Sequence, residues 1–468
     1  MRKKFLIAFM LFCLSLSSLS LLVSGCSSVD ESYHPVSSIE ELKAMQYNKN
    51  YRLDCDIDFQ GEEWLPVRVN NFDGGGHVIK NFSVFELPEF SHITNDNIGI
   101  GFFAKSNIVE NVVFEEITIN VSRTDSEDHT TFCGIVSGEG KEFKNVKVNN
   151  CSAKFLISNK ESFIYIGGMS GATAVAENCI LENVTVDAYS LSSFTYAGGV
   201  TGSLGFGLGF GDAPDLKSCK VINLTLTCNA ANAMGGLVGY MMETNSVIYS
   251  LKDSYIKDSK IEITSPKVIP SRAGGIIGYC ADFNTEITNC ASIGNEIYIF
   301  GAFGKYCSYE IGGIAGMSCG KISECLSQGN ILTGKGDSNS EKVIARVGGI
   351  CGYSEGTVSG CVAQLNAVSG TQLSGTNVSA CGLVAQSKSS IVNCAVFANT
   401  IKGINRDIFT EKNDRIFNCF ISDNEQSFPN VNKIEIMDDW NNAIDILTLN
   451  SDLWTIDENG ILNLIIVG

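Results

Sequence analysis

The chain is poor in several residue types, and each shortage excludes a class of structure or function. Of 468 residues, 7 are proline, 3 are tryptophan and 4 are histidine. Neither an HExxH motif nor a CxxC pair occurs, so a zinc protease of that kind and a zinc site built on paired cysteines are not expected. No segment beyond residue 25 is apolar for 18 residues, so we expect the rest of the chain to lie outside a membrane.

Basic residues are also in the minority. The chain has 51 acidic residues against 33 lysines and arginines, which gives a formal net charge of -18. Because binding to phosphate backbones needs clustered lysine and arginine, nucleic acid is not an expected partner. An acidic surface favours solubility and suits cations or basic partners.

The N-terminus carries the most specific local signal. A basic MRKK is followed by an apolar run over 5–23 and then by VSGC, which is the order of a secretory signal. Ser24 and Gly25 directly before Cys26 resemble the lipobox of bacterial lipoproteins. This resemblance implies cleavage before Cys26, a lipid on its sulfur, an extracellular location and a polar tether over 26–37. The alternative is an uncleaved membrane-spanning anchor.

Glycine is abundant, with 47 residues, and much of it recurs in one phrase of which AGGIIGY (273–279) is an example. In each copy a large apolar residue follows the glycine, and a small residue stands two positions later. Constraint at every second position indicates a half-buried strand. The aligned glycines, 31 to 39 residues apart, are Gly101, Gly134, Gly168, Gly199, Gly236, Gly275, Gly313, Gly349 and Gly382.

A second column of residues, mostly cysteines, recurs with the same period as the glycines. A third β-rich segment completes each copy. Three short strands per period predict an all-β fold, a β-solenoid of about ten coils whose neighbours stack about 4.8 Å apart. A β-propeller and stacked hairpins are the competing folds. We expect the glycines to mark a tight corner, with positive φ there. The second column is assigned to Cys151, Cys179, Cys219, Cys290, Cys325, Cys361 and Cys394, with Val112 and Tyr255 in two other copies.

The remaining cysteines are expected to be mostly free. Without Cys13 in the signal and Cys26 at the lipid, 16 of the 18 remain. Stacked neighbours would stand near 5 Å apart at the β-carbon, slightly too far for a good disulfide. A small apolar side chain also suits a packed interior.

The phrase GGLVG (235–239) and its relatives resemble the GLUG-motif repeats of bacterial surface proteins. The opening segment 51–84 is similar to a module of the same family, through the residues Asp56, Ile57, Asp58, Trp64, Pro66, Asp73, Gly74, Gly76 and His77. The resemblance implies a right-handed parallel β-helix and little about activity. We expect an N-terminal cap and first strands over 38–70, the β-helix over 71–425 and a C-terminal cap over 426–468. Ser38 with Glu41 predicts a short helix, and 437–450 a second.

No constellation of catalytic or metal-binding residues stands out. His34 is expected in a solvated loop and His77 in a structural role. Asp54, Asp56 and Asp58 begin like a calcium loop, but Phe59 occupies the place of the required glycine, which leaves only a weak cation site open. No catalytic residue, metal or cofactor is therefore assigned.

The candidate ligand contacts lie in two long loops. The interval between the glycine and the second column is largest over 199–290, and stacked coils would bring these insertions side by side. Apolar residues on loops above a rigid scaffold suit binding, although the phenylalanines could instead pack onto the solenoid. The candidates are Phe206, Phe210, Asp212, Asp215, Met241 and Met242.

The sequence thus predicts a lipid-anchored, non-catalytic binding or adhesin-like protein with a glycan or an extracellular protein as ligand. One alternative is a carbohydrate-active enzyme, a polysaccharide lyase or glycoside hydrolase, that uses a groove on the β-helix. Another is a structural spacer in the cell envelope.

Overall fold

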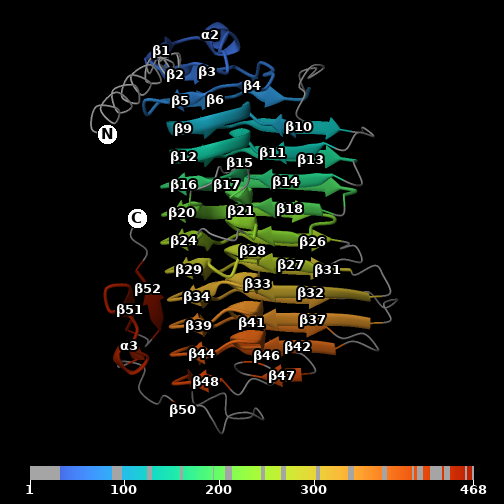
Figure 1. Ribbon diagram of the computed structural model, residues 1–468, viewed down its shortest axis with the longest axis vertical. Coiled ribbons are helices and arrows are strands. Elements are labelled where there is room, and N and C mark those ends of the chain that lie inside the picture. The colour runs from blue at the N-terminus through green and yellow to red at the C-terminus, as the bar shows by residue number, and fades with distance from the viewer. Residues whose placement is uncertain are drawn as a thin grey trace, which may run out of the picture.

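The computed structural model describes residues 32–86, 97–123, 129–158, 162–192, 194–205, 213–243, 248–264, 270–301, 306–335, 342–371, 377–402, 405–407, 410, 415–421, 435–436, 443–458 and 461–465. Coils of short parallel strands stack in chain order along one long axis (Figure 1). The fold is a parallel β-helix, so the prediction of a β-solenoid is confirmed. The expected number of coils, about ten, is close to the number found.

One side of each coil contributes a strand to a ten-stranded parallel sheet. Its strands follow one another in chain order, so each coil pairs with the next. They are β8 (Asn97–Ile100), β11 (Thr130–Cys133), β14 (Phe163–Gly167), β18 (Phe194–Gly198), β22 (Ala233–Gly235), β27 (Ser271–Gly274), β32 (Tyr306–Gly312), β37 (Lys342–Gly348), β42 (Asn377–Cys381) and β47 (Asn405–Asp407).

The other sides belong to one large sheet that bends around the solenoid. The row after the glycine corner comprises β9 (Phe103–Glu115), β12 (Ser137–Asn149), β15 (Ser170–Thr173), β19 (Thr201–Leu204), β23 (Val238–Met241), β28 (Ile277–Cys280), β33 (Ala315–Ser318), β38 (Cys351–Ser354) and β43 (Val384–Ser387). The following row comprises β16 (Val175–Glu177), β20 (Asp215–Lys217), β24 (Ser250–Lys252), β29 (Glu286–Thr288), β34 (Lys321–Ser323), β39 (Val358–Ser359), β44 (Ile391–Val392) and β48 (Ile416–Phe417).

Two more rows close each coil. The first comprises β25 (Tyr255–Lys257), β30 (Ala291–Ile293), β35 (Leu326–Gln328), β40 (Val362–Gln364), β45 (Ala395–Phe397), β49 (Phe420–Ile421) and β50 (Glu435–Ile436). The second comprises β10 (Thr118–Arg123), β13 (Ser152–Ile157), β17 (Ile180–Ser190), β21 (Lys220–Cys228), β26 (Lys260–Thr264), β31 (Glu296–Phe300), β36 (Ile331–Lys335), β41 (Ala367–Thr371) and β46 (Thr400–Lys402). The long strands β17 and β21 run through both rows.

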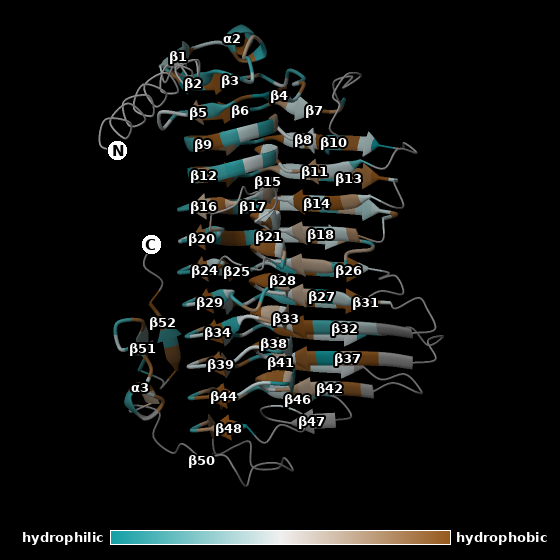
Figure 2. Cartoon of the chain, viewed as in Figure 1, coloured by the Kyte–Doolittle hydropathy of each residue, from teal (hydrophilic) through white to brown (hydrophobic). Residues whose placement is uncertain are grey.

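Like side chains pile up along the axis, as the repeat predicts. Leu237, Ile276, Ile314 and Ile350 are all fully buried. The backbone N–H of each donates to the carbonyl of its counterpart in the next coil, at 2.9 to 3.0 Å for the first three. These residues belong to one continuous apolar cluster that runs the length of the solenoid. Figure 2 shows apolar stretches recurring in strand after strand, for example in β32 and β37.

The repeat glycines are required for close approach and not for positive φ. A β-carbon on Gly313 would lie 2.2 Å from the carbonyl oxygen of Gly349, and one on Gly349 would lie 1.9 Å from that of Gly382. The backbone of one coil therefore lies directly on the next at this corner. The expectation of positive φ at the repeat glycines was wrong. Left-handed backbone occurs instead at two other corners, where asparagine is the most frequent residue. One of these columns comprises Asn111, Asn145, Asn178, Ser218, Asp253, Asn289, Glu324, Gly360, Asn393 and Asn418.

The cysteine column holds with two corrections. Val146, not Cys151, pairs into it, because Lys147 lies opposite Ile180 and therefore Val146 opposite Cys179. In the coil between Cys219 and Cys290, the column position is taken by Ser254 and not by Tyr255. The Ser254 hydroxyl accepts a hydrogen bond from the backbone N–H of Cys219 at 3.0 Å. The fifteen cysteines whose side chains the structure describes are all free, and all but Cys55 are buried, which confirms the expectation for them.

The N-terminal cap begins earlier than predicted. Tyr33–Val36 form β1, which pairs in parallel with β2 (Asn50–Leu53), so this part of the expected tether belongs to the fold. His34 lies in β1 with its ring 5.7 Å from that of Tyr51, and not in a solvated loop. Helix α2 (Ile39–Lys43) starts at Ser38, whose hydroxyl accepts from Glu41 N–H at 3.3 Å, as predicted.

The first strands lead from this cap into the coils. They are β3 (Ile57–Asp58), β4 (Val67–Arg68), β5 (Asn71–Asp73), β6 (Val78–Lys80) and β7 (Ser83–Val84). Trp64 is buried at this end, stacks on Phe102 with ring centroids 4.7 Å apart, and donates from its indole N–H to the Phe102 carbonyl at 2.7 Å.

The described part of the C-terminal segment packs on the side of the solenoid and not across its end. Helix α3 (Ala443–Ile446) and the antiparallel pair β51 (Trp454–Ile456) and β52 (Leu462–Leu464) lie beside the stack in Figure 1. They form a separate apolar cluster with outward-facing residues of the row that begins with β25, which we call the β25 row. These residues are Ala291, Leu326, Val362, Ala395 and Phe420. Trp454 donates from its indole N–H to Glu324 Oε2 at 2.7 Å.

Candidate functional site

Of the predicted ligand contacts, only three lie within the described residues. The candidates Phe206, Phe210 and Asp212 lie outside them, as does the predicted lipidation site Cys26. Met241 is fully buried in the core, so its assignment to the surface was wrong: the strand β23 extends through it before the loop begins. Met242 and Asp215 are half-buried.

The ends of the two long loops do lie side by side. Leu204 pairs with Met241 where the loops begin, and Asp215 pairs with Ser250 where they end. Two apolar side chains near this corner are well exposed, Ile248 at 64% and Phe283 at 61%. The described ends of the insertions therefore share one corner of the solenoid, as the spacing predicted for adjacent coils.

The neighbouring glycine corner is concave, and aromatic rings line it. In β18 the core residues Thr195 and Ala197 alternate with the outward-facing Tyr196. Its ring stacks at 4.5 Å on that of Tyr240, which lies on the far side of the glycine corner in β23. Two outward-facing rings can meet in this way only if the outer faces of the two strands turn toward each other.

The rings continue along the axis from coil to coil. Centroid distances are 5.4 Å from Phe132 to Tyr165, 5.5 Å from Tyr165 to Tyr196, and 5.5 Å from Tyr240 to Tyr279. Phe132 and Tyr165, with Tyr196 and Tyr240 packed against them, belong to an apolar cluster separate from the main core. We call the line of Phe132, Tyr165, Tyr196, Tyr240, Tyr279, Arg272, Glu310, Arg346 and Tyr353 the corner strip.

The second half of the corner strip is ionic. Arg272 lies over the ring of Tyr279 at 4.0 Å, and its Nε donates to Glu310 at 3.0 Å. Arg346 donates to the other oxygen of Glu310 at 2.8 Å and lies 4.8 Å from the ring of Tyr353. Glu310 is only 4% exposed, so this carboxylate is held by two guanidinium groups in a largely desolvated site.

Burial raises the pKa of the tyrosines of the corner strip further above physiological pH. Desolvation raises the pKa of Tyr196 to about 12 and that of Tyr279 to about 12, although Arg272 opposes the shift in both. Each phenol therefore retains its proton at physiological pH and can donate a hydrogen bond. The strip offers apolar ring edges, hydroxyl donors and two arginines along one line.

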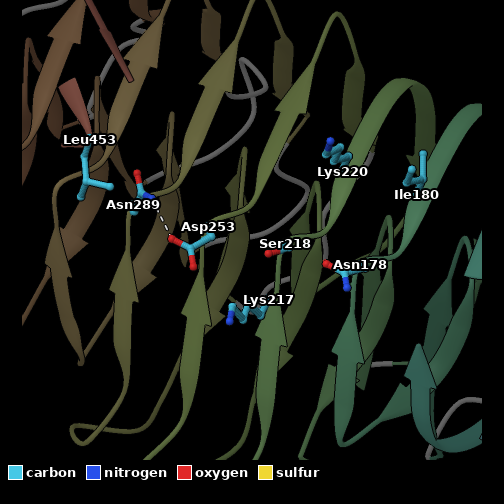
Figure 3. Close-up of a pocket in the computed structure, with 8 residues that line it drawn as sticks. All are labelled: Asn178, Ile180, Lys217, Ser218, Lys220, Asp253, Asn289 and Leu453. Atoms are coloured by element: carbon cyan, nitrogen blue, oxygen red, sulfur yellow. Dashed lines mark hydrogen bonds between the residues drawn. The ribbon is translucent and has the colours of Figure 1, made fainter. Parts of the chain in front are cut away.

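A pocket of about 520 Å³ lies between the side of the solenoid and the C-terminal segment (Figure 3). Its residues come from the left-handed corner and the strands on either side, with Leu453 from the C-terminal segment. They are Asn178, Ile180, Lys217, Ser218, Lys220, Asp253, Asn289 and Leu453.

The residues weighed for chemistry in the sequence have structural partners. His77 Nδ1 lies 3.0 Å from Asp56 Oδ1, and Asp58 accepts from the Asn81 amide at 2.9 Å. Hydrogen bonds lower the pKa of Asp56, chiefly the one from the Val78 backbone N–H. Within the described ranges, no group of three or more histidine, cysteine or acidic residues could hold a metal ion.

An asparagine ladder inside the solenoid was missed in the sequence. Asn295, Asn330 and Asn366 are at most 1% exposed and stack one per coil. The Oδ1 of Asn330 accepts from the backbone N–H of Asn295 at 2.8 Å, and its Nδ2 donates to the Ser292 carbonyl at 2.8 Å. The 35- and 36-residue spacing of these asparagines was the signal available. The ladder fixes the register of the scaffold that carries the corner strip and the pocket.

No helix among the described residues is long and apolar enough to cross a membrane. No family model and no curated protein matches the chain. Among solved structures, one described as "a putative immunoglobulin A1 protease from Bacteroides ovatus" is 14% identical, with 94% of each chain covered and a TM-score of 0.37. Similarity at this level says nothing about activity. The class that the geometry defines is a parallel β-helix with a lateral aromatic strip and a lateral pocket.

Proposed function

We propose that the protein is a non-catalytic binding module of the bacterial cell surface, held to the membrane by a lipid on Cys26. Its partner is an extracellular protein or glycan that docks along the corner strip. The observation that carries the proposal is the line of stacked rings, of which Tyr196, Tyr240 and Tyr279 are half-buried, that leads to two arginines on a concave corner of a rigid stack. Tyrosine and arginine are the residues on which binding energy at interfaces concentrates.

The scaffold suits this role because it holds the strip without flexible segments of its own. Each strip residue lies on a strand that is paired in register with the coils before and after it. Ordering these side chains on binding therefore costs little conformational entropy. The exposed Ile248 and Phe283 extend the apolar surface toward the loop corner.

Replacing two rings of the corner strip tests the proposal. The double variant Tyr240→Ser/Tyr279→Ser is expected to weaken binding to a partner selected on an array of matrix proteins and glycans by at least about tenfold, since 1.4 kcal/mol corresponds to that factor. Phe417→Ser, on an aromatic side chain that is 55% exposed in a distant coil, is the matched control and should leave binding unchanged. Equal binding by the strip variant and the wild type would contradict the proposal.

The loop corner can be tested without damage to the core. A deletion of 203–214 would remove Leu204, which is fully buried, so a deletion confined to 206–212 is the better variant.

Turnover of an acidic polysaccharide that is lost on a single Asp or Glu substitution would overturn the non-catalytic part of the proposal.

The lipid anchor has its own test. Metabolic labelling with palmitate is expected to mark the wild-type protein, and Cys26→Ala is expected to abolish the label, because the thioether forms on that sulfur. Cys55→Ala removes another thiol that is not deeply buried and serves as the control. Undiminished labelling of Cys26→Ala would remove the anchor from the account.

A further inference from the structure

We infer that the pocket beside the C-terminal segment binds an acidic saccharide of about two sugar units. The site is separate from the corner strip, since it lies at the left-handed corner between the β20 and β25 rows (Figure 3). Its volume of about 520 Å³ falls within the range of pockets that enclose small ligands.

The pocket opens where a side-chain ladder is interrupted. Along this corner, Asn145 donates to Asn111 at 2.9 Å and Asn178 donates to Asn145 at 3.4 Å. The ladder resumes where Asn289 donates to Asp253 at 2.7 Å. Between them stands Ser218, whose side chain is shorter than asparagine. At this interruption the side chains do not fill the corner, so a space remains that is lined by hydroxyl and amide groups.

The charge of the pocket indicates an anionic ligand. Lys217 and Lys220 lie on either side of Ser218 in Figure 3. Neither lysine is within 4.0 Å of a carboxylate among the described residues, in contrast to Lys252 in the next coil, which lies 4.0 Å from Asp215. With Asp253 as the one acid of the lining, the pocket carries a formal charge of about +1 on a protein of net charge -18.

The remaining lining suits a sugar ring. Asn178, Ser218 and Asp253 offer donors and acceptors for hydroxyl groups, while Ile180 and Leu453 supply two apolar walls. Asn289 is 4% exposed, and its Oδ1 has no hydrogen-bond partner within the described chain. A ligand hydroxyl would supply the donor that this oxygen lacks. A carboxylate that meets two lysines, beside hydroxyls that meet neutral polar groups, is the pattern of a uronic-acid disaccharide.

The test uses the full chain and titrates it by calorimetry with digalacturonic acid, with its neutral counterpart digalactose, and with inorganic phosphate. Digalacturonic acid is expected to bind at least tenfold more tightly than digalactose, and the difference is expected to shrink as salt rises. The double variant Lys217→Gln/Lys220→Gln should lose at least tenfold in affinity for the acid alone. Lys154→Gln, on an exposed lysine of another face, is the matched control and should bind like the wild type.

The outcomes separate this site from the corner strip. Tyr240→Ser/Tyr279→Ser should leave binding of digalacturonic acid unchanged, so failure of one site does not imply failure of the other. Equal affinity for the acidic and neutral disaccharides, wild-type affinity in the double lysine variant, or binding of inorganic phosphate as tight as that of digalacturonic acid would overturn the inference.

Discussion

Replacing Gly313 by alanine is expected to lower the free energy of unfolding by about 3 kcal/mol, measured by urea titration with far-ultraviolet circular dichroism. The new β-carbon would lie 2.2 Å from the Gly349 carbonyl oxygen and 2.0 Å from Ser327 Oγ. The carbonyl belongs to the backbone of the next coil and is fixed by its own hydrogen bonds. Relief of the clash therefore requires two coils to separate.

Gly329 provides the matched control for Gly313. It has φ of +65°, and no atom lies closer than 4.0 Å to the position of its absent β-carbon. Asparagine occupies the equivalent place at Asn183 and Asn223. Gly329→Asn is therefore expected to change stability by less than about 1 kcal/mol, because asparagine tolerates this backbone. A loss for Gly313→Ala no larger than that for Gly329→Asn would contradict the close-approach role of the repeat glycines.

Replacing Asn330 by alanine is expected to cost about 2 to 5 kcal/mol in the same measurement. The substitution leaves the buried Asn295 N–H without its acceptor, and an orphaned buried group costs about 1 to 3 kcal/mol. It also removes the hydrogen bond that Asn330 Nδ2 donates to the Ser292 carbonyl, which contributes about 0.5 to 1.5 kcal/mol. A backbone group buried in the core cannot replace the lost hydrogen bond with one to water.

The outer ladder gives the control for Asn330. Asn183 is exposed, has φ of +55° and donates to Asn150 at 3.1 Å. Asn183→Gly keeps the backbone conformation and removes two exposed hydrogen bonds, the one to Asn150 and the one that Asn183 Oδ1 accepts from the Asn223 amide at 2.8 Å. Because water can replace both, the expected cost is below about 1 kcal/mol. If Asn330→Ala cost no more than Asn183→Gly, the inner ladder would not hold the coils in register.

The coil and its axial core could be predicted because the relevant pattern is local. A large residue after the glycine and a small one two positions later mark one strand face, and their period places Leu237 above Ile276 and Ile314 without knowledge of the loops between them. The error at Cys151 arose because alignment by residue type chose a cysteine five residues beyond Val146, and only strand pairing distinguishes the two columns.

The lateral features could not be predicted because they depend on how coils bend. Tyr196 and Tyr240 are 44 residues apart and meet only because the corner turns inward. The C-terminal segment packs on Leu326 and Val362, two apolar residues that face outward, and no pattern in the sequence assigned them to this contact. The pocket requires both the short side chain of Ser218 and the nearby Leu453, and no sequence pattern joins them.

The most direct test of the stacked core is a map of cysteine reactivity, by maleimide labelling of the native and the unfolded protein with mass spectrometry. Burial raises the pKa of Cys325 and of Cys361, and both are fully buried, whereas Cys55 is partly exposed. We expect Cys55 to react in the native protein and the column cysteines to react only after unfolding. Rapid labelling of Cys325 and Cys361 in the native protein would contradict a core built from one residue of each coil.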